Sequence, residues 1–150
     1  MILAAILLAQ AATALPPACP NPPAALPADL GGWRATGEDL ASGKAITVAT
    51  MDPATVRLAG VPLPRQPGRM ALQTFRVTTT GTYGIALDQK GWIDLYDVRD
   101  MTALKSTRHG HGPDCSGIRK IVRFALTPGE YRVVVGGLAG AQAKLMLVRG

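Results

Sequence analysis

The sequence predicts an all-β fold, a single β-sandwich such as a jelly roll, that follows an extended N-terminal arm. Short runs rich in β-branched residues recur with turn residues between them, and no later ten-residue segment shows helical periodicity. Seventeen glycines and twelve prolines provide for many turns. Hydrophobic residues make up 47% of the 150-residue chain, which is enough for one domain with a core of small branched side chains.

Residues 1–14 have the pattern of a signal peptide. An apolar run over residues 1–9 leads to Ala12-Thr13-Ala14, which fits an A-x-A cleavage site. The run is too short to span a bilayer, and no later segment approaches eighteen apolar residues. We therefore expect no transmembrane segment and an exported protein, periplasmic or extracellular.

Residues 15–32 form the predicted arm, because a segment this rich in proline and alanine disfavours regular helix. Trp33 follows, and we expect it to anchor the arm to a β-sandwich domain of residues 33–150. The expected strands of that domain cover residues 44–50, 55–59, 73–79, 83–88, 92–98, 101–106, 118–126, 131–135 and 143–149. Pro128-Gly129 is expected to join a hairpin, and residues 136–140 to form a further turn.

The run WIDLYDV, residues 92–98, alternates in character. Ile93 and Leu95 share one face of the expected strand, and Trp92, Asp94 and Tyr96 share the other. Trp92 and Tyr96 are therefore candidate ligand-binding residues that form an aromatic platform for a sugar. The alternative is that both rings pack against another sheet.

The chain has two cysteines, Cys19 and Cys115. An exported chain meets an oxidising compartment, and an even cysteine number favours a disulfide there. That bond would tie the arm to the domain and close a long loop, for which the chain-entropy model gives roughly 4 to 5 kcal/mol. The alternative is a free Cys115 thiolate that acts as a ligand or nucleophile.

The stretch HGHGPDCSGIRK, residues 109–120, holds both histidines of the chain. In a strand, His109 and His111 would point to one side, and Asp114 or a reduced Cys115 would complete a set of ligands for iron, zinc or copper. The other interpretation is a stapled turn between two strands that needs no cofactor. In it, Gly110 and Gly112 adopt positive φ and Pro113 begins the turn.

Two segments, FRVTTTGTYGIALDQKGWIDLYD and FALTPGEYRVVV, place a tyrosine just after a Gly-Thr or Pro-Gly turn. In this they resemble bacterial pre-peptidase C-terminal domains and related carbohydrate-binding-like sandwiches, over about residues 73–136. A tyrosine at such a corner can bury its ring while its hydroxyl reaches the backbone. The resemblance implies a non-catalytic module that assists export or surface attachment.

The whole chain also resembles a group of small exported bacterial proteins of unknown role, some of which carry the label homogentisate 1,2-dioxygenase. That label implies a cupin in which two histidines and a glutamate hold iron. Here His109-Gly110-His111 is followed by Asp114 where the cupin motif has a glutamate further on, and no third histidine occurs.

The formal net charge is +6, and the arginines are spread along the chain without a basic run. Basic tracts interleaved with aromatic residues are absent from the sequence, so we expect no nucleic-acid partner. Two function classes remain. One is an exported, non-catalytic binding or accessory module for a cell-surface or extracellular polymer. The other is a small metal-dependent enzyme that uses the His109 and His111 cluster.

Overall fold

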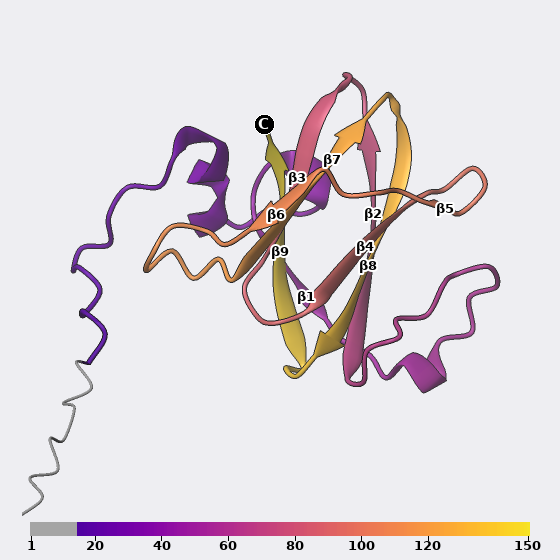
Figure 1. Cartoon of the computed structure of the whole chain (residues 1–150), viewed down its shortest axis with the longest axis horizontal. Helices are drawn as coiled ribbons and strands as arrows, with labels where there is room; N and C mark the ends of the chain where they lie inside the picture. The colour runs from indigo at the N-terminus through magenta and orange to yellow at the C-terminus, as the bar shows by residue number, and fades with distance from the viewer. Residues whose placement is uncertain (1–14) are drawn as a thin grey trace, which may run out of the picture.

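The computed structural model describes residues 15–150, and the predicted signal peptide, residues 1–14, lies outside them. These residues form a two-layered β-sandwich with an arm at its N-terminal end (Figure 1). The three short 3-10 helices are η1 Ala28–Arg34, η2 Leu40–Ser42 and η3 Pro53–Thr55. The strands are β1 Ile46–Ala49, β2 Arg69–Val77, β3 Gly81–Leu87, β4 Trp92–Asp97, β5 Thr102–Ala103, β6 Arg108–Gly110, β7 Lys120–Leu126, β8 Gly129–Leu138 and β9 Gln142–Arg149.

The strands divide into two antiparallel sheets. One has the order β1-β9-β3-β7-β6 and the other the order β2-β8-β4-β5. Most consecutive strands therefore lie in opposite sheets, which is the interleaved arrangement of a jelly roll, with the short β6 as an added edge strand. The predicted all-β sandwich is confirmed.

Two tyrosine corners stand where the chain crosses between the sheets. Tyr83 donates its hydroxyl hydrogen to the carbonyl of Thr79 at 2.7 Å, just after the crossing from β2 to β3. Tyr131 does the same to Thr127 at 2.8 Å, after the crossing from β7 to β8. Both rings are buried. The sequence pattern correctly placed two corners in which the ring fills the core and the hydroxyl is satisfied by the backbone.

The space between the sheets is filled by apolar side chains. Ile85, Leu95, Val133 and Leu145 are each at most 1% exposed, and full burial of one such side chain stabilises the fold by about 1.5–3 kcal/mol. The rings of Phe75 and Tyr131 pack with centroids 5.9 Å apart. The predicted inward face of β4 is confirmed, since Ile93 and Leu95 belong to this core.

A second apolar cluster lies on the outer face of the five-stranded sheet. There η1 packs through Leu30 and Trp33 against Met146 and Val148 of β9, and Ile121 of β7 joins them. Residues 15–27 lead into η1 without regular structure, so the extended part of the arm ends at Pro27 instead of residue 32. No proline occurs within Ala28–Arg34, and the 3-10 turns form there.

Three expectations about local structure are wrong. Residues 55–59 form no strand, because Asp52 caps the short helix η3 through the N–H of Ala54. β8 continues through residues 136 and 137 to Leu138, so the turn comes later than expected. Strands β7 and β8 are not a hairpin, since β8 pairs with β2 and β4 while β7 pairs with β3 and β6.

Among residues 15–150, no helix is both long enough and apolar enough to cross a membrane.

Candidate functional site

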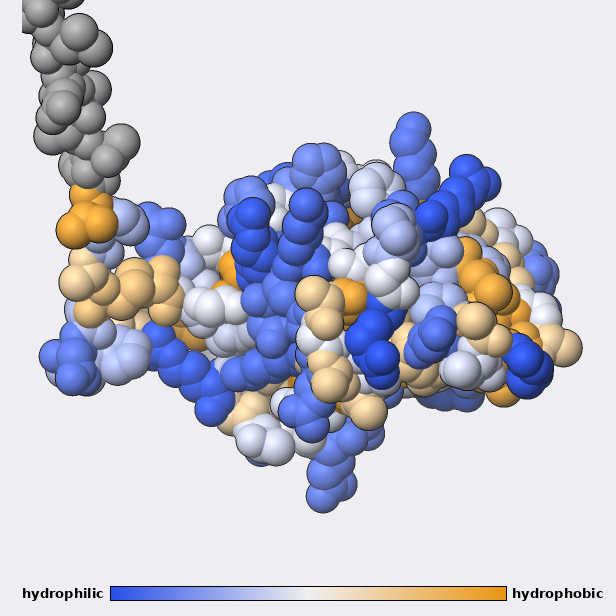
Figure 2. Space-filling view, turned by 90° about the horizontal axis from the view of Figure 1, so that it is seen from below, coloured by the Kyte–Doolittle hydropathy of each residue, from blue (hydrophilic) through white to orange (hydrophobic). Residues whose placement is uncertain are grey.

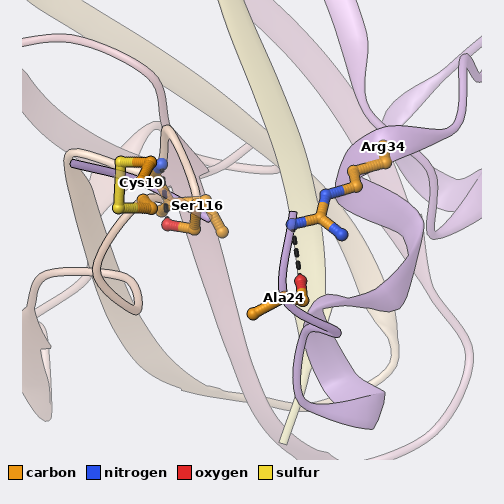
Figure 3. Close-up of a disulfide and its surroundings, with 6 residues drawn as sticks. Cys19, Ala24, Arg34 and Ser116 are labelled. Atoms are coloured by element: carbon orange, nitrogen blue, oxygen red, sulfur yellow. Dashed lines mark hydrogen bonds between the residues drawn. A yellow bond between two sulfur atoms is a disulfide. The ribbon is translucent and has the colours of Figure 1, made fainter. Parts of the chain in front are cut away.

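The stretch HGHGPDCSGIRK joins two paired strands. Its first residues belong to β6, which pairs antiparallel with β7 through His109↔Val122 and Gly110↔Ile121. The intervening loop carries Cys115, which is bonded to Cys19 with a Cα–Cα distance of 5.6 Å (Figure 3). The predicted disulfide and the stapled turn are both present. Cys115 therefore has no free thiolate to offer as a ligand or nucleophile.

The arm is attached to this loop a second time, next to the disulfide. Trp33 is 2% exposed and donates its indole N–H to the carbonyl of Ser116 at 3.0 Å. Arg34 holds the arm in turn, through a 2.7 Å hydrogen bond from its guanidinium to the carbonyl of Ala24 (Figure 3). Trp33 thus anchors the arm, as expected, and its partner is the stapled loop.

The backbone of the loop differs from expectation at its glycines. Positive φ occurs at Cys115 (61°) and Gly117 (76°), and Gly110 and Gly112 are not among the positive-φ residues. Gly112 is needed for space instead, because a Cβ there would come within 2.4 Å of the Cβ of Ile118. The tight turn is built around the disulfide itself, with Ser116 N–H bonded to the carbonyl of Pro113 at 3.1 Å.

The structure does not gather the three candidate metal ligands. His109, His111 and Asp114 are all exposed, and within residues 15–150 no three His, Cys, Asp or Glu side chains lie close enough to share a metal ion. The Nδ1 atom of His111 lies 2.7 Å from the carbonyl oxygen of Arg119, a contact that requires the hydrogen on Nδ1. The Arg119 guanidinium also lies 3.3 Å from this nitrogen.

Charges of both signs surround the histidines. Both imidazoles border a hollow of about 250 Å³ whose charged residues are Arg108 and Arg123. His111 and Asp114 border a neighbouring hollow of about 430 Å³ with Asp88 and Arg119. The arginines would repel a metal ion, and the two aspartates would attract it, so charge alone does not favour a metal site here. The two imidazoles border one hollow, and among residues 15–150 no third His, Cys, Asp or Glu side chain joins them as a ligand.

Trp92 and Tyr96 lie on the outer face of the four-stranded sheet. They border one hollow of about 420 Å³, the aromatic hollow, together with Asp94 and residues of a proline-rich loop, namely Pro62, Leu63, Arg65 and Gln66. Trp92 is 51% exposed, and its indole N–H donates to Asp94 Oδ1 at 3.1 Å, which fixes the plane of the ring. The predicted common face of Trp92 and Tyr96 is therefore found, and its outward direction leaves the tryptophan open to solvent.

The electrostatics of the aromatic hollow centre on Tyr96. Burial raises the pKa of its hydroxyl, and the Asp94 carboxylate raises this pKa further. Arg65 acts in the opposite direction and lowers it. Tyr96 consequently stays a neutral hydroxyl that can donate or accept a hydrogen bond at ordinary pH.

One wall of the aromatic hollow is the proline loop, residues 62–67, which lies directly on β8. A Cβ at Gly136 would come within 2.2 Å of the Cβ of Pro64, so the loop sits in space that glycine leaves open. Gln66 borders the hollow, and its buried Oε1 has no hydrogen-bond partner among the described residues. A buried acceptor without a donor costs about 1–3 kcal/mol.

Trp92 also borders a second hollow on its other side. This hollow has a volume of about 280 Å³ and lies between β4 and the strands β6 and β7, with Ile93 and Val122 among its lining residues. Lys120 stands at its edge, with Nζ 5.1 Å from the centroid of the indole ring and 2.8 Å from the carbonyl of Gly91. Trp92 is thus the shared rim of two hollows, one on the sheet face and one between the sheets.

Sequence reasoning found the aromatic residues of the hollow and missed its loop residues. Arg65 and Gln66 lie in a segment that the sequence identifies simply as a loop with three prolines. The pair Gly136-Gly137, which the sequence pattern favours as a turn, lies in strand β8, where glycine often marks a close approach of another backbone. That signal does not tell which segment approaches.

Comparison of the chain with protein-family models and with curated proteins finds no match. The class of protein is therefore defined by its architecture: a jelly-roll sandwich with a stapled arm on one face and an open aromatic hollow on the other.

Proposed function

We propose that this chain is an exported, non-catalytic binding module whose aromatic hollow takes a saccharide segment of a cell-surface or extracellular polymer. The observation that carries the proposal is the pairing of Trp92 and Tyr96 around one hollow on an open sheet face. Ligand sites are concave, lined by apolar and aromatic side chains, and supplied with a few polar groups that fix orientation.

The polar groups of the aromatic hollow suit a polyhydroxylated ligand. Arg65 offers several donors, Asp94 offers acceptors and Tyr96 offers both. The unpartnered Oε1 of Gln66 lacks a donor, and a ligand hydroxyl that reached it after a small rotation of the amide would offset the cost of that burial. Trp92 supplies a broad apolar ring surface at the mouth of the hollow.

The number of carboxylates at the aromatic hollow favours binding of a saccharide over its hydrolysis. Most glycoside hydrolases use a pair of Asp or Glu residues on either side of the scissile bond. Among the described residues, Asp94 is the one carboxylate that borders the aromatic hollow. Its Oδ1 already accepts the Trp92 N–H, which suits an orienting role.

Export is the second part of the proposal. The apolar N-terminal run with its A-x-A site favours it, and the Cys19–Cys115 disulfide fits an oxidising compartment such as the periplasm or the cell exterior. The resemblance of the tyrosine corners to pre-peptidase C-terminal domains also suits a non-catalytic accessory role. That resemblance stays a prediction.

The test is a binding screen with the mature protein against soluble polysaccharides, neutral and acidic, by affinity electrophoresis and then calorimetry. Trp92→Ala and Tyr96→Ala are expected to weaken binding by about tenfold or more, because an exposed aromatic ring is a typical binding hot spot. Leu58→Ala is the matched control, since Leu58 is 60% exposed and does not border the aromatic hollow. Equal affinity of Trp92→Ala and the unaltered protein would refute the proposal.

A further inference from the structure

The open face around the aromatic hollow carries arginines that the protein does not neutralise. The described residues form three ion pairs, which use Arg76, Arg99 and Arg123. Arg65 and Arg132 take part in none of them. Two cations on this face therefore keep their full charge available to a ligand.

Both arginines belong to the aromatic hollow or its immediate border. Arg65 lines it. Arg132 of β8 lies directly opposite Tyr96 of β4 in the antiparallel register. Its neighbours Tyr131 and Val133 point into the core, so Arg132 points outward to the same side as Tyr96. Directly opposed residues on one face have Cβ atoms about 5 Å apart.

A third cation stands beyond Trp92. Lys120 Nζ lies over the indole ring, on the side of the 280 Å³ hollow. The one carboxylate of the aromatic hollow, Asp94, is already bonded to the Trp92 N–H. Three cations against one carboxylate leave a net positive charge around the hollow. The chain as a whole carries a formal charge of +6, which attracts polyanions at long range.

We propose that the saccharide taken by this face is an acidic polymer, with carboxylate or sulfate groups that contact Arg65 and Arg132 while a sugar ring lies against Trp92. This inference rests on the proposed function and names the ligand class of the same site. Arginine suits it because its planar guanidinium forms paired hydrogen bonds with carboxylate and with other oxyanions. A carboxylate and a sulfate share this chemistry, so the test includes one polymer of each kind.

The probes are polygalacturonate, a sulfated galactan and a neutral polymer, xylan, measured by calorimetry with the full mature chain. Arg65→Gln and Arg132→Gln are each expected to weaken binding of an acidic polymer about tenfold and to leave neutral-polymer binding unchanged. Arg108→Gln is the matched control: it removes the same charge from an exposed arginine on β6 of the other sheet. Arg132→Lys keeps the charge and should recover part of the affinity, and thermal unfolding reports whether each variant is folded.

Salt separates specific contact from general attraction. Affinity for the acidic polymer should fall as salt rises from about 0.05 to 0.5 M, because exposed charges are screened over a shorter distance. Equal loss in Arg108→Gln and Arg65→Gln would overturn the inference, since attraction would then follow net charge alone. A preference for xylan would overturn it while leaving the proposed function intact, and absence of binding to every polymer would refute both.

Discussion

The two outer faces of the sandwich are treated in opposite ways. The outer face of the five-stranded sheet is covered by η1, which follows the arm (Figure 1); the disulfide and Trp33 attach this segment to the domain. The face of the four-stranded sheet has one loop over part of it and leaves Trp92 half exposed. Hydrophobic residues gather at the end of the molecule away from the arm, where the proline loop lies (Figure 2). The packed cover stabilises the fold on one side, and the other side keeps an open surface.

The two tryptophans, Trp33 on the covered face and Trp92 on the open face, differ in the same way as the faces themselves. Both have a satisfied indole N–H and both have a lysine over the ring, at 4.6 Å for Lys144 and Trp33 and at 5.1 Å for Lys120 and Trp92. What separates them is exposure, 2% for Trp33 and 51% for Trp92. Similar local contacts therefore serve folding in one place and leave a free ring surface in the other.

Trp33→Ala is expected to have the largest effect on stability. Removal of a buried tryptophan typically lowers the free energy of unfolding by about 3–5 kcal/mol, and here it also leaves the carbonyl of Ser116 without its donor. Denaturant unfolding measures the loss. Trp92→Ala is the comparison, with a smaller loss of about 1–2 kcal/mol expected because half of its surface is already in water. Similar losses in both variants would end the contrast between the faces.

Removal of the disulfide tests whether the cover needs its covalent attachment. The double change Cys19→Ser with Cys115→Ser is expected to lower the free energy of unfolding by about 2–5 kcal/mol, since the bond closes a separation of 96 residues. Trp33 should keep η1 on the sheet in the folded state. Ligand affinity at the aromatic hollow should not change, and a tenfold loss of that affinity would show that the two faces are coupled.

Gly136→Ala is expected to act on the open face alone. The new Cβ would overlap the ring of Pro64, so the proline loop must move away from β8 at a cost of about 1–3 kcal/mol. The wall that carries Arg65 and Gln66 would shift with it, and binding should weaken. Gly31→Ala is the control on the covered face, because a Cβ there meets nothing within 4 Å. Normal binding by a folded Gly136→Ala variant would show that the loop is not part of the site.

Local sequence signals predicted the sandwich, the two tyrosine corners and the faces of β4, because each depends on alternation or on a turn next to it. The pairing between strands was harder to predict from the sequence. The Pro128-Gly129 turn is compatible with a hairpin and with a crossing between sheets, and in either case Tyr131 and Val133 point inward. Only contacts with β2 and β4 decide in favour of the crossing.

Some residues of the candidate site could likewise be predicted from local sequence signals, and others could not. Trp92 and Tyr96 share a strand, so their common face follows from the two-residue period of the strand. The disulfide was predicted from the even cysteine count and from the expected oxidising compartment. Arg65 and Gln66 reach the hollow from an irregular loop, whose position depends on the gap above Gly136. The two histidines are close in sequence, but the loop around Cys115 gives them no common third ligand.

Acidification should have the smallest effect, at one end of the four-stranded sheet. Hydrogen bonds from the Arg99 side chain and backbone hold the pKa of Asp97 at about 2, below the ordinary value of 3.8. The folded state thus binds this proton less readily than the unfolded state. The stabilisation is complete above about pH 4 and is lost as the pH falls through about 2. Because the pair is at the surface, we expect a small change, visible as a flatter stability profile between pH 5 and 2 in Asp97→Asn than in the unaltered protein. Parallel profiles would mean that the ionisation of Asp97 contributes nothing to the pH dependence of folding stability.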